Sequence, residues 1–224
     1  METESATSVK RVPAPWDLKG KGYILLYKFP KNFVMENGSI PAFLGNSFAG
    51  GLGAVMIVDY TQSDAGPYGE LLFIPGKFHF NQQKLNCITK IYVSTRESVE
   101  NGWANWAIPK KLADFSFTRP EGRTRKERAV VKIEKEAILD ITLRHGKLTF
   151  PIHTTLIPFP LVQKKDDKLY HTNFKGKGAA QLAQIENIQV NPELFPDIAL
   201  YRPLIVLRVF NFSITFPVAH ITGT

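Results

Sequence analysis

Alternating hydrophobic and polar positions run through much of the chain and predict strands rather than helices. The alternation is clearest at residues 130–134, Val-Val-Lys-Ile-Glu, and at residues 138–144, Ile-Leu-Asp-Ile-Thr-Leu-Arg. A period of two with one polar face is typical of half-buried antiparallel strands. Further candidate strands are rich in Val, Ile, Phe, Tyr and Thr and are separated by Gly and Pro: residues 23–28, 54–60, 70–74, 87–93, 113–118, 128–135, 147–150, 169–174, 188–190 and 204–216.

Helices are predicted at only a few places. Residues 94–97 read Ser-Thr-Arg-Glu, which matches a capping box and predicts a short helix over residues 95–103. Residues 178–185 form a second candidate helix, and residues 41–48 form a third. Sixteen glycines and fifteen prolines suit a chain with many turns. The pattern therefore predicts a mainly β protein, either a strand-rich barrel or a double-lobed sheet.

Length and composition fit one folded unit. The chain has 224 residues, of which 44% are hydrophobic and 21% charged. We expect a flexible N-terminal tail over residues 1–14 and a single domain over residues 15–224. An apolar run of about twenty residues is missing, and residues 1–7 are acidic and polar, so we expect a cytoplasmic protein with no membrane partner. Cys87 is the only cysteine, which excludes an internal disulfide framework and favours a buried, inert thiol.

The net charge of +8 raises the possibility of an anionic partner. Basic residues are densest over residues 119–135, where three glutamates are interleaved with them. We interpret this segment as the solvated face of a hairpin and expect no nucleic-acid partner. Binding of a polyanion through the same segment is the alternative, and it predicts steeply salt-dependent association.

The sequence gives little support for a metal site or a phosphate-binding site. Gly50-Gly51-Leu52-Gly53 precedes a strand instead of a helix, and residues 176–178 lack the spacing of a phosphate-binding loop. The histidines do not pair at the spacings that metal sites use. We therefore predict neither a metal nor another cofactor. The five histidines are His79, His145, His153, His171 and His220.

Two adjacent lysines, Lys110 and Lys111, stand in the otherwise apolar stretch 107–113, shortly after two tryptophans. Core packing alone rarely places lysine in such a stretch. Lysines whose ammonium groups reach solvent from a surface turn are one interpretation. The other is an amine in an apolar pocket, where the uncharged, nucleophilic form is favoured and can attack a carbonyl. Neighbouring residues on an extended segment point to opposite faces, so only one of the two lysines can enter the pocket.

Glu70 opens an otherwise apolar strand, directly after the turn at residues 66–69. It is either a solvated acid at a strand end or a general acid/base paired with a buried lysine. Lys28 stands at the end of another apolar strand, and on its own a solvated position explains it.

These segments resemble the acetoacetate decarboxylase family. Residues 108–112, Ile-Pro-Lys-Lys-Leu, are similar to its Pro-Lys-Lys-Leu signature, and residues 66–70, Gly-Pro-Tyr-Gly-Glu, are similar to its Gly-x-Tyr-x-Glu loop. The order and separation of the two signatures also agree. Tyr27-Lys28 falls where these enzymes carry Tyr-Arg. The resemblance covers most of the chain, and its specific motifs lie within residues 66–112.

The resemblance implies a cone-shaped antiparallel β-barrel with a few short helices, assembled into homo-oligomers. It also implies that Lys110 forms an imine with a 3-oxo acid, so that the carboxylate can leave as CO2. Glu70 would position the substrate or transfer a proton, and Lys111 would tune the charge of the nucleophile from behind. The residues expected to bind the substrate are Lys28, Tyr68 and Trp106.

The sequence departs from the family pattern at three places. Residues 53–56 contain no acid where the decarboxylases carry a second pocket carboxylate. Lysine in place of arginine at position 28 loses a bidentate carboxylate contact. Residues 105–107, Asn-Trp-Ala, are bulkier than usual. Two alternatives to decarboxylation therefore stay open, an aldolase or dehydratase that uses the same lysine and a relative that binds an oxo acid without catalysis.

Overall fold

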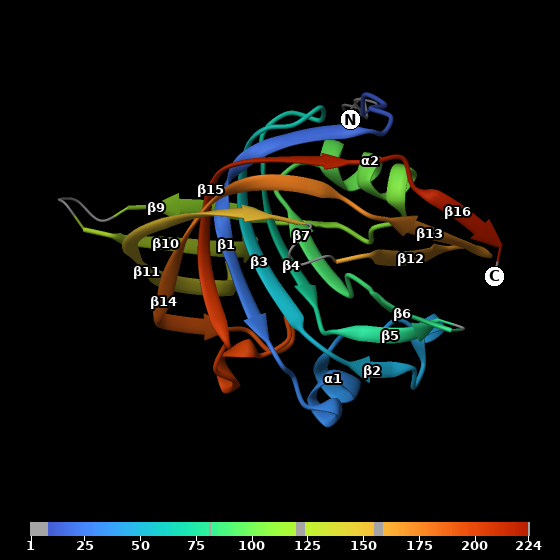
Figure 1. Ribbon diagram of the computed structural model, residues 1–224, viewed down its shortest axis with the longest axis horizontal. Coiled ribbons are helices and arrows are strands. Elements are labelled where there is room, and N and C mark those ends of the chain that lie inside the picture. The colour runs from blue at the N-terminus through green and yellow to red at the C-terminus, as the bar shows by residue number, and fades with distance from the viewer. Residues whose placement is uncertain (1–8, 81, 120–123, 155–158, 224) are drawn as a thin grey trace, which may run out of the picture.

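The computed structural model describes residues 9–80, 82–119, 124–154 and 159–223, and strands form most of it (Figure 1). The strands belong to two sheets. In spatial order, the ten-stranded sheet contains β8 (Lys111–Leu112), β7 (Lys90–Val93), β4 (Tyr68–Ile74), β3 (Gly53–Gln62), β1 (Trp16–Tyr27), β15 (Ile205–Phe216), β14 (Lys175–Val190), β11 (Glu136–His153), β10 (Lys126–Ile133) and β9 (Asp114–Thr118). The six-stranded sheet contains β16 (His220–Gly223), β13 (Lys168–Thr172), β12 (Leu161–Lys165), β6 (Gln83–Asn86), β5 (Lys77–Phe80) and β2 (Phe48–Gly50).

The ten-stranded sheet curves into a nearly closed barrel. Its neighbouring strands are antiparallel except for the short β7–β8 pair. Strand β9 approaches β4 so closely that a Cβ atom on Gly69 would lie 2.6 Å from Cγ of Phe115. Glycine is therefore required at this position of the 66–70 motif. The prediction of a mainly β barrel is confirmed.

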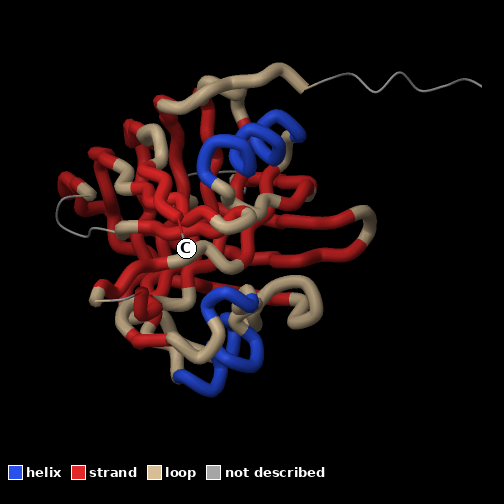
Figure 2. The backbone as a smooth tube through the Cα atoms, turned by 90° about the vertical axis from the view of Figure 1, so that its right-hand side faces the viewer, coloured by secondary structure: helices blue, strands red, loops and turns tan. Residues whose placement is uncertain are grey.

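Helices lie on two separate sides of the strand-rich body (Figure 2). The helix predicted over residues 95–103 is confirmed as α2 (Arg96–Trp106), and its N-cap Thr95 accepts a hydrogen bond from the backbone N–H of Ser98. Helix α1 (Lys31–Asn37) was not predicted. The helix predicted over residues 41–48 is wrong, because this segment contains the 3-10 turn η1 (Ala42–Leu44) and the first residue of strand β2. A second 3-10 turn is η2 (Ile198–Leu200).

The helix predicted over residues 178–185 is wrong, because this segment is the middle of strand β14. Alanine, glutamine and leucine favour a helix, but intrinsic propensity is a weak preference that tertiary pairing overrides. Here β14 pairs with β11 on one side and with β15 on the other. Ala180, for example, lies between Phe150 and Val209.

Two hydrophobic clusters lie on opposite faces of β1 and β3. Alternate residues such as Tyr23 and Ile57 belong to the first cluster, while Leu26 and Val58 belong to the second. The second cluster also contains Trp106 from α2 and side chains from the smaller sheet. Because side chains alternate along each strand, one stretch of sequence supplies both clusters. The candidate site described below lies within the second cluster.

The described part of the segment before β1 is hydrogen-bonded to helix α2 at Lys10 and Val12. Val12 donates its backbone N–H to Oδ1 of Asn101 at 2.7 Å, and Nδ2 of Asn101 donates to the carbonyl of Lys10 at 3.0 Å. Residues 1–8 of the predicted tail lie outside the described residues.

Several cations of the basic segment 119–135 have acidic partners. Lys126 lies 2.7 Å from Glu186, and Arg119 lies 2.7 Å from Glu127. Residues 120–123 of the segment lie outside the described residues. The observed pairs agree with a solvated hairpin face more than with a surface for polyanions. Among the helices described, none has the length and apolar character needed to cross a membrane.

Candidate active site

The end of helix α2 directs Lys110 into the protein. Ala107 follows the helix with a positive φ of 55°, and this left-handed conformation turns the chain away from the helix axis. Lys110 comes three residues later and is only 9% exposed, whereas Lys111 begins strand β8 and is exposed. The expectation that the two lysines point to opposite sides is confirmed.

The amine of Lys110 is surrounded by two polar groups and two aromatic rings. Its Nζ lies 3.2 Å from Oε2 of Glu70 and donates a hydrogen bond to Oγ of Ser98 at 2.9 Å. The same atom lies 5.0 Å from the centre of the Tyr68 ring and 5.9 Å from that of Trp16. The side chains of Lys110 and Glu70 are only 4% and 6% exposed. The structure therefore brings the two signature residues into direct contact away from water.

This contact allows a proton to be shared between the amine and the carboxylate. Moving one proton from Lys110 to Glu70 converts a charged pair into a neutral pair without changing the total charge of the site. The distance of 3.2 Å between the two groups is short enough for such a transfer. Tyr60 donates its hydroxyl to Oε1 of Glu70 at 3.2 Å and fixes the orientation of the carboxyl group.

Two residues of helix α2 that the sequence analysis missed make room for the lysine. A Cβ atom at Gly102 would lie 2.8 Å from Cδ of Lys110, so the lysine chain packs directly on the helix backbone. Ser98, which accepts the amine's hydrogen bond, is fully buried one helical turn earlier. Residues four apart share one face of a helix, so the sequence could have paired Ser98 with Gly102. It could not have shown that Lys110 packs there.

The tyrosines of the site remain protonated. Burial is the main cause that raises the pKa of Tyr60 and of Tyr68 well above its usual value, and the nearby charge of Glu70 raises both further. Their rings lie 4.7 Å apart. Both phenols therefore stay uncharged, and the Tyr60 hydroxyl is a hydrogen-bond donor to Glu70. Tyr68 was predicted as a site residue, and Tyr60 was not.

A cavity of about 60 Å³ lies against Lys110 and Glu70. Trp106, predicted as a substrate-binding residue, is among its lining residues, and its Nε1 donates to the carbonyl of Pro217 at 2.6 Å. Its ring meets Trp16, which the sequence analysis did not single out, edge to face at 4.9 Å. The rest of the wall is mainly apolar and includes Leu72, Ile74, Ile91, Ile108 and Leu161.

Two predicted residues do not reach this cavity. Lys28 is exposed and directly follows the last residue of β1. Glu70 pairs with Val58 of β3, and Val58 in turn pairs with Gly22 of β1. Lys28 lies six residues beyond Gly22, which corresponds to about 20 Å at the usual rise per residue of a strand. Lys111 is exposed, and its charge acts on Lys90, whose pKa is lowered first by burial and then by this lysine.

Other reactive groups lie away from the cavity. Among the described residues there is no cluster of three or more His, Cys, Asp or Glu side chains that could hold a metal ion. Cys87 is buried, its Sγ lies 3.3 Å from Oε1 of Gln163, and burial raises the pKa of its thiol. The thiol therefore stays protonated, as expected of an inert cysteine.

Comparison with known proteins points to one family. The family model described as acetoacetate decarboxylase matches residues 39–159, which include both signatures. A search of curated proteins finds no match. Among solved structures, acetoacetate decarboxylase from Legionella pneumophila is similar over all of this chain and 92% of its own, with a TM-score of 0.74 and 13% identity.

Two further solved structures have the same fold and different descriptions. The enduracididine biosynthesis enzyme MppR, complexed with the condensation product of pyruvate and imidazole 4-carboxaldehyde, aligns with 97% of this chain and 92% of its own, with a TM-score of 0.66 and 13% identity. An acetoacetate decarboxylase-like enzyme from Sphingomonas wittichii aligns with 95% of this chain and 94% of its own, with a TM-score of 0.64 and 14% identity.

Proposed function

This chain belongs to the acetoacetate decarboxylase family, and on that premise we propose that it is a Schiff-base-forming lyase. Its substrate would be acetoacetate or a related 3-oxo acid, and its products a ketone and CO2. One observation carries the proposal: the buried amine of Lys110 contacts the carboxylate of Glu70 beside an apolar cavity. A nucleophilic lysine next to a proton acceptor is what imine chemistry needs.

The first stage joins the substrate to the enzyme. Glu70 holds the proton of the amine, and the free Nζ of Lys110 attacks the carbonyl carbon of the 3-oxo acid. The carbinolamine then loses water, with Glu70 as the proton donor, and gives a protonated imine. Ser98, which accepts a hydrogen bond from Nζ, orients the amine during attack.

The second stage breaks the carbon–carbon bond. The electron pair of the bond to the carboxylate moves toward the positively charged imine nitrogen, CO2 leaves, and an enamine remains. The apolar wall around the site favours this step. When water is excluded, a spread-out charge loses less solvation free energy than the compact charge of a carboxylate. Glu70, which gave up its proton when water left, takes up a proton from solvent and delivers it to the enamine carbon, and water then hydrolyses the resulting imine to the ketone and free Lys110.

A second candidate function uses the same lysine for aldol or dehydration chemistry. Among the described residues that line the Lys110 cavity, Glu70 is the only carboxylate, in agreement with the missing acid at residues 53–56. A substrate whose carboxylate is retained would need only this one acid/base group. The similar fold of MppR, described with a pyruvate condensation product, is compatible with this alternative.

Borohydride reduction in the presence of acetoacetate tests the proposal. Intact-mass analysis followed by peptide mapping should find an isopropyl group on Lys110, since decarboxylation precedes reduction. An adduct on Lys110 that still carries the carboxylate would favour the second candidate. A protein that gives no adduct with acetoacetate, pyruvate or other 2-oxo and 3-oxo acids would contradict both.

The family resemblance also leads us to propose that the chain forms homo-oligomers. Light scattering of the purified protein, which reports molar mass directly, tests this. A monomeric mass would contradict it.

A further inference from the structure

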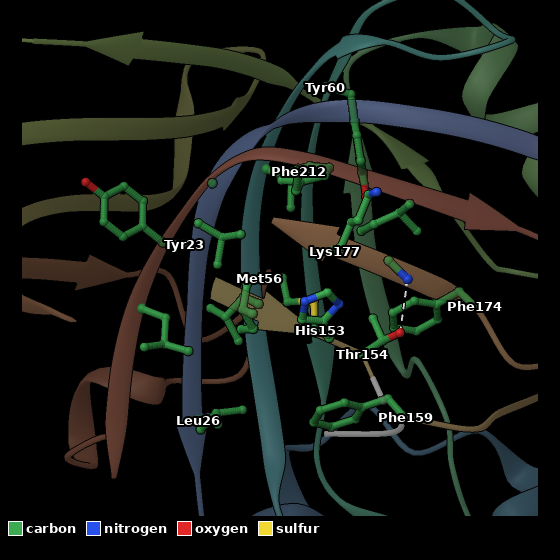
Figure 3. Close-up of a pocket in the computed structure, with 18 residues that line it drawn as sticks. Tyr23, Leu26, Met56, Tyr60, His153, Thr154, Phe159, Phe174, Lys177 and Phe212 are labelled. Atoms are coloured by element: carbon green, nitrogen blue, oxygen red, sulfur yellow. Dashed lines mark hydrogen bonds between the residues drawn. The ribbon is translucent and has the colours of Figure 1, made fainter. Parts of the chain in front are cut away.

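A second and larger cavity adjoins the Lys110 cavity. It has a volume of about 110 Å³, and we call it the side chamber. Figure 3 shows the side chains that surround it, which come mainly from β1, β3, β11, β14 and β15. Nearly all of its wall is apolar, with Leu26, Val58, Phe159, Phe212 and Val209 among the contributors. A dry apolar wall of this kind favours a hydrocarbon group.

The side chamber is separated from the Lys110 cavity by a single layer of side chains. Four residues line both cavities: Met56, Tyr60, Phe174 and Ile214. Met56 and Phe174 are only partly buried, and methionine has three rotatable bonds that adapt to neighbouring groups. Tyr60 faces the side chamber with its ring while its hydroxyl donates to Glu70. A molecule attached at Lys110 can therefore extend into the side chamber if Met56 or Phe174 changes rotamer.

The outer end of the side chamber is polar and positively charged. His153 on β11 and Lys177 on β14 are directly opposite each other, and both are exposed. Thr154 and Gly176 hold the two strands together there through hydrogen bonds of 3.0 Å in each direction. An exposed lysine at the mouth of an apolar space favours the approach of anions. The charge is thus suited to an acid that carries an apolar chain.

We propose that the side chamber receives the hydrocarbon chain of the substrate, so that the preferred substrates are 3-oxo acids with chains longer than that of acetoacetate. This rests on the proposed function, because the carbonyl carbon must be bound at Lys110. The acid enters past Lys177, its chain stays between β1, β3 and β15, and its oxo group reaches the amine. Acetoacetate, which has only a methyl group beyond the carbonyl, would leave the side chamber empty.

Chain-length dependence of turnover tests the proposal. Each methylene transferred from water to an apolar site improves binding by roughly three- to fourfold. The values of kcat/KM should therefore rise by about that factor per methylene from acetoacetate to 3-oxohexanoate and 3-oxooctanoate. Values that stay constant or fall along this series would overturn the assignment.

A substitution that fills the side chamber sharpens the test. Ile24 lines the side chamber but not the Lys110 cavity, so Ile24→Phe should lower the ratio of kcat/KM for 3-oxooctanoate to that for acetoacetate at least about tenfold. Ile221→Phe is the matched control, because Ile221 is 48% exposed on β16 and lies outside both walls. An unchanged ratio in folded Ile24→Phe protein would overturn the proposal.

A binding measurement separates this inference from the proposed function. Octanoate has no oxo group and forms no imine, so the difference between its binding to wild-type protein and to Ile24→Phe protein, measured by calorimetry, reports on the side chamber. If acetoacetate gives an adduct on Lys110 but octanoate does not bind, the proposed function stands and the side chamber does not hold the chain. If octanoate binds but no oxo acid gives an adduct in the wild-type protein, the proposed function fails and the substrate assignment fails with it.

Discussion

Two clusters of a glutamate, a tyrosine and a basic residue lie on opposite faces of strands β1 and β3. In the second hydrophobic cluster, Glu70 accepts a hydrogen bond from Tyr60 and contacts Lys110. On the other face, Glu127 accepts a hydrogen bond from Tyr23 at 2.8 Å and contacts Arg208 at 3.0 Å. The two arrangements differ mainly in the cation.

That difference separates a reactive cluster from a structural one. Arginine stays protonated in proteins, whereas a buried lysine can give up its proton. Burial raises the pKa of Glu127, but hydrogen bonds from Arg208 and Tyr23 outweigh it and lower the pKa overall. Glu127 is therefore a permanent carboxylate between permanent cations. The proposed function requires proton exchange only in the cluster around Glu70.

The largest effect is expected from giving the Glu70 cluster the arginine of the Glu127 cluster. Lys110→Arg should lower kcat/KM by at least about a thousandfold and abolish borohydride trapping, because a guanidinium group cannot form the imine. Turnover of a 3-oxo acid together with mass analysis of the trapped protein measures this. Retained turnover would refute the imine mechanism.

Lys111→Arg is the matched control for this variant. It makes the same change at the exposed neighbour, which lies outside the Lys110 cavity. Activity close to that of the wild type is expected, because the charge at position 111 is kept. A loss as large as that of Lys110→Arg would mean that the wrong lysine has been assigned.

Glu70→Gln should be the next most damaging change to activity. Loss of a positioned general acid/base costs about a hundred- to ten-thousandfold in rate, while the amide keeps the size of the side chain. Steady-state kinetics and circular dichroism on the same sample measure activity and fold separately. An unfolded variant would show that Glu70 is needed for structure, and a fully active one would exclude it from proton transfer.

Glu127→Gln should show the opposite behaviour. It leaves Arg208 partly buried without its carboxylate, so the free energy of unfolding should fall by roughly 2 kcal/mol, measured with chemical denaturant. The values of kcat/KM should change little. Glu186→Gln serves as control, because its partners Lys126 and Arg144 are both exposed and the loss should be clearly smaller. Activity lost along with stability would remove the distinction between the two clusters.

The fold was largely predictable because strands leave a local signature. Alternation in residues 130–134 and 138–144 identified the β10–β11 hairpin, and the capping box identified α2. The failure at residues 178–185 has a physical cause: a segment between two strands gains more from pairing than from its own helical preference. No short-range pattern reports such a gain.

Of the candidate site, mainly the residues within the two signature motifs could be predicted from the sequence. Lys110 and Glu70 were identified from apolar surroundings and family signatures, and the structure brings them within 3.2 Å. Ser98 and Gly102 were missed, because their role depends on how α2 packs against a residue that follows it in the chain. Lys28 was assigned to the pocket by analogy of position, and the geometry of β1 places it at the far end of that strand.

Tyrosine ionisation should connect the two clusters to stability at high pH. Burial raises the pKa of Tyr60 and of Tyr23 above the value in the unfolded chain, which is about 10. The unfolded chain therefore loses protons first, and the free energy of unfolding falls above about pH 10 by up to 1.4 kcal/mol per pH unit for each tyrosine.

Phenylalanine variants show which tyrosines are responsible. Between about pH 9 and pH 11, the free energy of unfolding measured with denaturant should fall less steeply with pH in Tyr60→Phe and in Tyr23→Phe than in the wild type. Of these two variants, Tyr60→Phe should also lower kcat, because Tyr60 donates a hydrogen bond to Glu70 whereas Tyr23 donates to Glu127. Curves that coincide with the wild type would show that these phenols ionise equally in the folded and unfolded chains.

The smallest effect is expected at the mouth of the side chamber, where Lys177 is exposed. Lys177→Gln should lower kcat/KM for anionic 3-oxo acids by roughly two- to threefold at low salt, and high salt should remove the difference, because the lysine acts on the approach of the anion. Lys175→Gln makes the same change two residues earlier on β14, at an exposed position outside the side-chamber wall, and should have a smaller effect. Equal effects of the two substitutions would mean that net charge, and not a positioned cation at this mouth, attracts the substrate.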